Sequence, residues 1–242
     1  MFPRIKISKV EKAKTGIPGL DEIIEGGINR GTVVSVTGET GTGKTTFATQ
    51  FLYKGAAEYG EPGLFISFEE SKRSLYRNMA RFGWDLEELE RKRKFVFIEY
   101  PLSEIDQFLT QEGVIRDLVD TIGIERIAID SISALALAWE SERERRQGLL
   151  KIMDRLRRWG CTSIITAESE GEVAAGAPRT KHGAEWLSDG LIHLYNIRKG
   201  NYRERALEII KLRGVSHECR IIPMSFTSKG LVLHPTRLFF TE

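Results

Sequence analysis

The sequence predicts an α/β fold with a central, mostly parallel sheet that is flanked by helices and extended by antiparallel strands near the C-terminus. Three observations lead to this prediction. Between residues 32 and 167, short apolar runs alternate with amphipathic helical stretches, which is the pattern of right-handed βαβ crossovers. A glycine-rich motif at Gly38–Thr45 joins the first strand to the first helix. Beyond residue 190 the helical pattern stops and only strand-like runs continue.

The alternating part of the chain contains five expected strands and four expected helices. The strand segments are short and rich in Ile, Val and Phe, as expected when helices cover both faces of a parallel sheet. They are Thr32–Val36, Leu64–Phe68, Phe95–Glu99, Arg126–Asp130 and Thr162–Ala167. The helical segments carry apolar residues at helical spacing. They are Lys44–Glu58, Lys72–Phe82, Glu104–Thr121 and Glu142–Trp159.

The C-terminal part is expected to extend the sheet with antiparallel strands, because short polar turns separate its strand-like runs. These runs are Leu191–Ile197, Ala206–Leu212, Arg220–Thr227 and Gly230–Leu233. No linker or internal repeat is found, so residues 1–242 are expected to form a single domain. The segment Ser169–Gly183 is rich in Gly and Ala and lacks periodicity. It is expected to be a mobile loop at the C-terminal edge of the parallel strands, where such folds bind ligands.

Composition indicates an ordinary soluble protein of 242 residues, with 41% hydrophobic and 29% charged residues. The net charge of +2 gives no global electrostatic case for nucleic acid or an acidic membrane. No apolar run reaches the roughly 18 residues of a membrane span, and the N-terminus lacks the apolar core of a signal peptide. Cys161 and Cys219 lack metal-ligand spacing, and Cys161 is expected to be a buried, reduced thiol. These features favour a cytoplasmic protein with no membrane partner.

The motif at Gly38–Thr45 matches the phosphate-loop pattern G-x-x-x-x-G-K-[ST] in full. A β-branched strand precedes it and an amphipathic helix follows it, so the helix N-terminus would point at bound phosphates. Lys44 would approach the β- and γ-phosphates, and the Thr45 hydroxyl would bind Mg²⁺. The alternative is a glycine-rich turn without a ligand, which this context disfavours. The predicted nucleotide-binding residues are Gly38, Thr40, Gly41, Thr42, Gly43, Lys44, Thr45 and Thr46, and Lys44 is also predicted to act in catalysis.

Asp130 is the candidate for the acid that positions the metal ion. It ends the apolar run Arg126–Asp130, where a buried carboxylate requires a partner or a metal ion. The alternative role is a helix N-cap, because Asp130-Ser131 precedes Ile132. The metal role is favoured, because a phosphate loop requires such an acid.

Glu69 and Glu70 are candidates for orienting or deprotonating the attacking water. They follow the strand Leu64–Phe68, so they would lie at the C-terminal edge of the sheet near the γ-phosphate. The alternative is capping and dipole compensation for the helix that follows. The residues alone favour neither role.

A third cluster, Lys211-Leu212-Arg213-Gly214-Val215-Ser216-His217, ends a late strand. Lys211, Arg213 and His217 stand at odd-numbered positions of this extended segment, so they would share one face, which suits an anion. The alternative is a solvated edge strand that its charges protect from aggregation, and composition slightly favours it.

Several segments together resemble the KaiC family of RecA-like ATPases. They cover residues 15 to 235 and include Thr15–Asp21, Gly26-Gly27, Arg30-Gly31, Gly41–Phe47, Ser67–Glu70, Phe82–Leu86, Ile129–Ser131 and Lys211–Gly214. The resemblance implies a RecA-like fold and a homo-oligomer, a hexameric ring with ATP and Mg²⁺ between its subunits. It assigns water activation to Glu69 and Glu70. It assigns Lys211, Leu212, Arg213 and His217 to the nucleotide of the neighbouring subunit.

The chain also departs from the family pattern. It has one such domain, whereas the clock protein of this family has two, and it lacks counterparts of that protein's phosphorylation sites and regulatory tail. Ala167-Glu168-Ser169 stands where a basic residue can follow the acid, and Val215 replaces a hydroxyl residue that can contact nucleotide. Clock function and autokinase activity are therefore not implied.

The favoured function is a slow ATPase ring that acts as a switch or signalling scaffold for an unidentified protein partner. The alternative is a DNA-directed recombinase or helicase-like motor, with Arg179, Lys181 and His182 in a pore loop. Other basic stretches are interleaved with acids or face solvent, so nucleic acid is a possible partner but not the favoured one. A third hypothesis is a nucleotide-binding assembly protein with almost no turnover.

Overall fold

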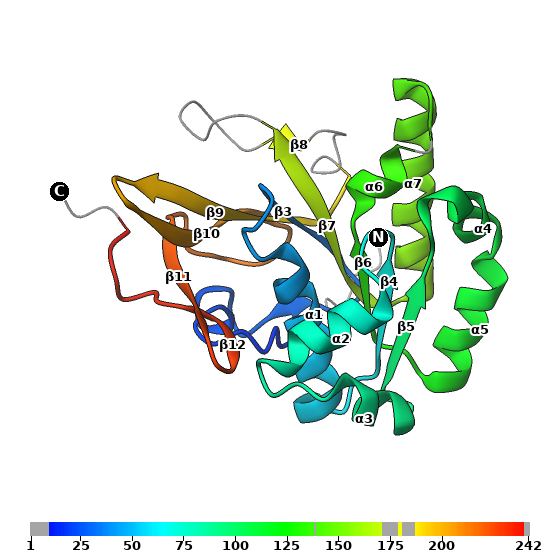
Figure 1. Cartoon of the computed structure of the whole chain (residues 1–242), viewed down its shortest axis with the longest axis horizontal. Helices are drawn as coiled ribbons and strands as arrows, with labels where there is room; N and C mark the ends of the chain where they lie inside the picture. The colour runs from blue at the N-terminus through cyan, green and yellow to red at the C-terminus, as the bar shows by residue number, and fades with distance from the viewer. Residues whose placement is uncertain (1–9, 138, 171–178, 181–186, 240–242) are drawn as a thin grey trace, which may run out of the picture.

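The computed structural model describes residues 10–137, 139–170, 179–180 and 187–239. Its central sheet has the strand order β12-β11-β10-β9-β3-β7-β6-β4-β5, and β8 pairs with β7 (Figure 1). The parallel strands are β3 (Val33–Gly38), β4 (Gly63–Ser67), β5 (Phe95–Glu99), β6 (Arg126–Asp130), β7 (Thr162–Glu170) and β9 (Gly190–Lys199). The antiparallel extension is β10 (Tyr202–Leu212), β11 (Ile222–Thr227) and β12 (Gly230–Leu233). The predicted fold class is therefore confirmed.

Helices cover both faces of the sheet (Figure 1). One face carries α1 (Lys44–Lys54), its π-helical continuation (Gly55–Tyr59), α2 (Lys72–Ala80) and α3 (Leu86–Arg91). The other face carries α4 (Ile105–Thr110), α5 (Glu112–Ile122), α6 (Ile132–Ala136) and α7 (Glu142–Trp159). Short 3-10 turns at Asp21–Ile23 and Leu102–Glu104 and a separate pair of strands, β1 (Lys12–Ala13) and β2 (Ile28–Asn29), complete the described elements.

Alternate residues of each parallel strand supply the two hydrophobic cores. Val34 and Val36 of β3 pack in the core beneath α1, whereas Val33 packs in the core beneath α7. In β4, Phe65 enters the first core, and Leu64 and Ile66 enter the second. Successive side chains of a strand point to opposite faces, so a continuous apolar run fills both layers.

The structure corrects several details of the predicted elements. The expected helix Glu104–Thr121 is interrupted at Gln111, whose ψ of 32° is not helical, and α4 and α5 are separate helices. The short helices α3 and α6 were not predicted, although Asp85 and Ser131 cap them with side-chain hydrogen bonds. Such caps are readable in sequence, but helices of six and five residues are too short to show a convincing period.

The expected loop Ser169–Gly183 is partly strand. Strand β7 continues to Glu170 and pairs in antiparallel fashion with β8 (Arg179–Thr180). The remaining residues of this segment lie outside the described part of the chain. They include Lys181 and His182 of the predicted pore loop, and the side chain of Arg179 is not described either.

Cys161 is free and buried, as expected, and Cys219 is free and exposed. Burial raises the pKa of the Cys161 thiol to about 12, so it is uncharged at neutral pH. No helix among the described residues is long and apolar enough to cross a membrane.

The carboxyl ends of the parallel strands meet at one edge of the sheet. Gly38 at the end of β3 is in register with Glu168 of β7, and Ser67 at the end of β4 is in register with Asp130 of β6. The sheet therefore brings the phosphate loop, Asp130 and the residues after Ser67 to the same edge, where open α/β sheets bind ligands.

The opposite edge of the sheet is anchored by a buried arginine. Arg126 is fully buried at the start of β6, where its Nε donates to Glu61 Oε2 at 2.5 Å and its Nη1 donates to the Phe51 carbonyl oxygen at 2.8 Å. Its guanidinium lies 4.4 Å from the centroid of the Phe51 ring. Glu61 also accepts a hydrogen bond from Arg30. Burial lowers the pKa of Arg126, and the charge of Glu61 opposes this effect.

Glu61→Gln is expected to lower the free energy of unfolding by about 3–5 kcal/mol, because it leaves a buried guanidinium without its counter-ion. Chemical denaturation at neutral pH measures this loss. Glu125→Gln is the matched control, since Glu125 pairs with the same Arg30 at 2.9 Å but is 46% exposed. It is expected to cost about 1 kcal/mol or less. Equal losses in the two variants would contradict the assigned role of the buried pair.

Candidate nucleotide-binding site

The phosphate loop connects the end of β3 to the start of α1 at the carboxyl edge of the sheet (Figure 1). Helix α1 begins at Lys44, and its N-cap, Gly43, has a φ of 106°. No side chain caps this helix. The N–H groups of its first turn have no partner within the helix, so they and the helix dipole are available to an anion.

Glycine is required at two positions of this loop. Gly41 and Gly43 both have positive φ, 80° and 106°, which residues with a Cβ adopt only with strain. At Gly43 an added Cβ would also lie 2.5 Å from Cζ of Phe226. The loop backbone is therefore packed directly against the aromatic ring of β11.

Lys44 folds back over the loop. Its Nζ donates to the carbonyl oxygens of Gly38 at 2.9 Å and Glu39 at 3.0 Å. Burial lowers the pKa of Lys44, and the negative charge of Glu168 is the strongest of the nearby charges that oppose this effect. The ammonium group thus lies against two loop carbonyls, and the charges of several carboxylates act on it.

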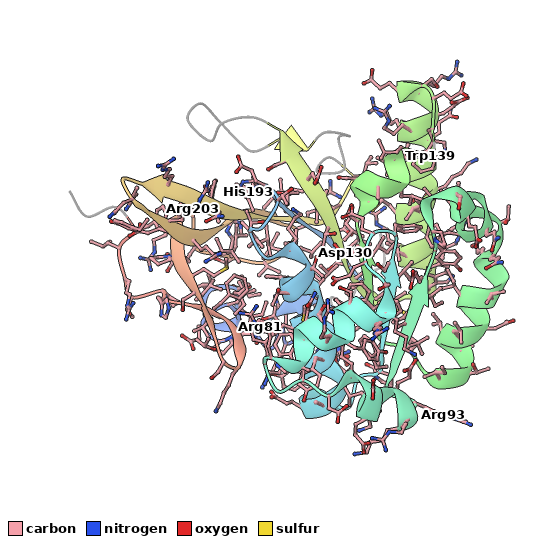
Figure 2. All side chains as sticks on the ribbon, in the orientation of Figure 1. Arg81, Arg93, Asp130, Trp139, His193 and Arg203 are labelled. Atoms are coloured by element: carbon pink, nitrogen blue, oxygen red, sulfur yellow. The ribbon has the colours of Figure 1, made fainter. Side chains whose placement is uncertain are left out.

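Thr45 and Asp130 lie together, as their predicted roles require. The Thr45 hydroxyl donates to Asp130 Oδ2 at 2.8 Å, and the Thr166 hydroxyl donates to the other carboxylate oxygen. Asp130 is 5% exposed, and burial raises its pKa, whereas its bonds with Thr166 and Thr45 lower it. Figure 2 labels Asp130, which ends β6. The helix α6 is capped by Ser131 rather than Asp130, so the alternative capping role of Asp130 is wrong.

These oxygen donors fit Mg²⁺, which prefers oxygen ligands and is commonly held by one or two protein groups together with substrate phosphates. Among the described residues, no group of three or more His, Cys, Asp or Glu side chains could hold a metal ion by itself. A metal ion at Thr45 and Asp130 would therefore need ligands from a bound nucleotide and water.

Glu69 and Glu70 have different surroundings. Glu69 is exposed to the cavity and accepts a hydrogen bond from Ser131, the residue after Asp130. Glu70 is half-buried, and its Oε1 accepts hydrogen bonds from Ser74 and Asn78 of α2, both at 2.7 Å. Glu69 thus contacts the residue that follows Asp130, the candidate metal ligand, whereas Glu70 is bound by side chains from the first two turns of α2.

A cavity of about 600 Å³ contains most of these groups. The predicted residues that line it are Thr40, Gly41, Gly43, Lys44, Thr45, Thr46, Glu69, Glu70 and Asp130. Gly38 and Thr42 support the loop from within, since Gly38 accepts from Lys44 and the Thr42 hydroxyl donates to the Glu39 carbonyl oxygen at 2.8 Å.

Sequence reasoning missed a further part of the wall of this cavity, next to Gly43 of the phosphate loop. Arg81 lies 5.1 Å from the ring of Phe82, Phe82 stacks on Phe226 at 6.4 Å between centroids, and Arg205 lies 5.1 Å from the ring of Phe226. These four side chains come from the end of α2 and from β10 and β11, and Arg81 is labelled in Figure 2. They contact one another in the order Arg81, Phe82, Phe226 and Arg205. The two rings and two guanidinium groups offer flat surfaces and positive charge to a ligand.

Glu168 is a further lining residue without a predicted role. The Thr40 hydroxyl donates to its Oε1 at 3.4 Å, and its backbone N–H donates to Ser133 Oγ at 2.8 Å. Glu168 belongs to the segment Ala167-Glu168-Ser169, in which members of the KaiC family can have a basic residue. The sequence therefore marked this position as unusual, but it did not indicate that Glu168 lines the cavity.

The structure does not bring Lys211, Leu212, Arg213 or His217 to this cavity. Lys211 is opposite Leu191 and thus level with Ser35, whereas the phosphate loop begins three residues farther along β3. At about 3.3 Å per residue, this separates them by about 10 Å along the strands, and β9 lies between β10 and β3. Leu212 is buried in the core beneath α1, and His217 is partly exposed.

The fold and the site define a phosphate-loop nucleotide-binding protein with a RecA-like sheet. A family model described as "ATPase: KaiC" matches residues 13–237, and the chain belongs to this KaiC ATPase family. The resemblance seen in the sequence motifs is therefore confirmed.

Relatives of two lengths match the chain. A UPF0273 protein of Methanocaldococcus jannaschii is 34% identical over 95% of this chain and 98% of its own length. The circadian clock oscillator protein KaiC of Synechococcus elongatus is 33% identical over 93% of this chain, which covers only 44% of the clock protein. Among solved structures, a KaiC-like protein of Pyrococcus horikoshii has a TM-score of 0.84 and 41% identity, over 94% of this chain and 100% of that one.

Proposed function

We propose that residues 1–242 form one domain that binds ATP with Mg²⁺ and hydrolyses it slowly within a ring of identical subunits. The ring, a hexamer, would act as a switch or signalling scaffold for a protein partner. One observation carries this proposal: a single cavity combines the open N-terminus of α1, Lys44, the Thr45–Asp130 pair and Glu69. This set contains a phosphate cradle, oxygen ligands for a metal ion and a carboxylate for water activation.

The cavity supports a definite orientation of the nucleotide. The phosphates would lie on the first turn of α1 beside Lys44, with Mg²⁺ at Thr45 and Asp130, where it would neutralise negative charge on the phosphates. The base would lie toward Arg81, Phe82, Phe226 and Arg205. The flat aromatic and guanidinium groups in this part of the wall suit a purine, whose faces stack on such surfaces.

The balance of charge supports completion of the site by a second subunit. Among the described residues that line the cavity, Lys44 is the only lysine, and the acids Asp130, Glu69 and Glu168 are close enough to influence its charge. Triphosphate hydrolysis requires cationic groups to stabilise the charge of the transition state. Lys211 and Arg213 lie too far from their own phosphate loop to provide it, and we propose that they, with Leu212 and His217, reach the nucleotide of the adjacent subunit.

Size measurement with and without ATP and Mg²⁺, combined with an ATPase assay with and without single-stranded DNA, tests this function. We expect a ring-sized species with nucleotide and slow hydrolysis that DNA leaves unchanged. A monomer with no nucleotide binding would overturn the proposal. Stimulation by DNA that weakens with added salt would favour the DNA-directed alternative, since phosphate contacts are salt-dependent. Rings that bind ATP without hydrolysing it would identify an assembly protein instead.

A further inference from the structure

The segment that follows β10 is held by the carboxylate of a residue that precedes a neighbouring strand. Asp189 stands immediately before β9, and its side chain is 16% exposed. Arg213 Nη1 donates to Asp189 Oδ1 at 3.4 Å, and the Arg213 backbone N–H donates to the Asp189 carbonyl oxygen at 3.0 Å. Asp189 therefore contacts both the guanidinium and the backbone of Arg213, while the Arg213 side chain remains 64% exposed.

Asp189 is itself fixed by two other elements. The backbone N–H of Val33, at the start of β3, donates to Asp189 Oδ2 at 3.1 Å. Arg157, in the last turn of α7, donates to both carboxylate oxygens of Asp189, at 3.4 and 3.3 Å, and to the Leu187 carbonyl oxygen at 2.7 Å. Hydrogen bonds between charged groups are about twice as strong as neutral ones, so the carboxylate has a well-defined position.

Asn29 holds the same segment from the other side. Its Nδ2 donates to the Arg213 carbonyl oxygen at 3.1 Å, and Asn29 is 8% exposed. The next residue, Gly214, has a φ of 68°, and a Cβ there would lie 3.3 Å from Asn29 Nδ2. The chain thus turns sharply where Asn29 binds it, and the guanidinium of Arg213 projects outward from a fixed backbone.

We infer that Asp189 and Asn29 are positioning residues that present the guanidinium of Arg213 to the nucleotide bound by a second copy of this chain. The inference rests on the proposed function, in which Arg213 acts across the subunit interface. An exposed arginine loses considerable side-chain entropy when it is fixed. Asp189 and Asn29, here called the Arg213 clamp, fix the backbone of Arg213 and one of its guanidinium nitrogens before assembly, which reduces this cost. The clamp also limits misplacement of the guanidinium, since an error of about 1 Å in the position of a catalytic group can lower a rate by about 10²-fold.

Mixed rings distinguish this role from a purely structural one. Asp189→Asn is expected to lower ATP hydrolysis by about tenfold or more, with unchanged affinity for a fluorescent ATP analogue. Lys44→Ala subunits have a defective phosphate loop but an intact Arg213 clamp. In rings co-assembled from both variants, an Asp189→Asn subunit can receive an intact Arg213 from a Lys44→Ala neighbour. The rate of hydrolysis per Asp189→Asn subunit should therefore rise with the fraction of Lys44→Ala subunits. Asn29→Ala removes the hydrogen bond that β2 contributes to the clamp. It should show the same loss of hydrolysis and the same recovery in mixed rings.

Two controls complete the experiment. Asp154→Asn removes the other acid that pairs with Arg157, at 3.6 Å, but Asp154 is 64% exposed and has no contact with Arg213, so hydrolysis should not change. Arg213→Ala mixed with Lys44→Ala tests the shared site directly. If that mixture recovers hydrolysis but the Asp189→Asn and Asn29→Ala mixtures do not, the clamp is disproved and the shared site stands. If the Arg213→Ala mixture fails to recover, the shared site and the clamp both fail. Full hydrolysis by Asp189→Asn rings alone would also overturn the clamp.

Discussion

Lys44→Ala is expected to weaken ATP binding by about 10²–10⁴-fold and to abolish hydrolysis, while the protein remains folded. Two hydrogen bonds from the ammonium group to phosphate oxygens, at about 1.5–3 kcal/mol each, account for this range. Lys44 is the only lysine among the described residues that line the cavity, and it is the lysine that the phosphate-loop motif requires. Titration with a fluorescent ATP analogue measures the affinity.

The fold should tolerate this change, because Lys44 bonds only to loop carbonyls, at Gly38 and Glu39, among its hydrogen bonds in the described structure. Lys54→Ala is the matched control. Lys54 is the last residue of the same helix, where it pairs with Glu58, and its side chain is 22% exposed. Its loss should leave ATP affinity unchanged. Wild-type affinity in Lys44→Ala would disprove the assignment of the phosphate loop.

The phosphate loop and the parallel sheet could be predicted from the sequence because both depend on local patterns. Residues 38–45 have fixed spacing, and their glycine positions follow from backbone geometry that holds in any protein with this loop. The strands Val33–Gly38 and Arg126–Asp130 are continuous apolar runs that the two covered faces of the sheet require. Asp130 could be identified because it ends such a run.

The wall formed by Arg81, Phe82, Arg205 and Phe226 could not be predicted in this way. Phe226 contacts Gly43 through the packing of strands that are far apart in the sequence, and nothing in the residues around Phe226 indicates this contact. The alternation within β11 predicts only that some of its side chains face the core. Which of them faces the cavity depends on the register of β10 and β11, in which Arg205 pairs with Met224.

The different surroundings of Glu69 and Glu70 could not be predicted from the sequence either. Two adjacent acids after a strand have the same local pattern, and their position alone allowed both catalysis and capping. The structure separates them because Ser74 and Asn78 of α2 bind Glu70, whereas Ser131 binds Glu69 beside Asp130. Both acids line the cavity, but in the described structure Glu69 bonds to the residue after Asp130, the candidate metal ligand, whereas Glu70 bonds to α2.

Glu69→Gln is therefore expected to lower the rate of ATP hydrolysis by about 10²–10⁴-fold, the usual contribution of a general base, with ATP affinity retained. Gln preserves the size of the side chain and its ability to accept from Ser131, but it cannot take a proton from water. Steady-state phosphate release and titration with a fluorescent ATP analogue separate the effect on rate from the effect on affinity.

Glu70→Gln is the matched comparison, and we expect it to lower the rate by about tenfold or less, as for a residue that acts through its neighbours. A Gln at this position still accepts hydrogen bonds from Ser74 and Asn78, so α2 should keep its place. A larger loss in Glu70→Gln than in Glu69→Gln would reverse the two assignments. Equal losses of about 10²-fold or more would mean that the two carboxylates activate water as a pair, and that the contacts of Glu70 with α2 change when nucleotide binds.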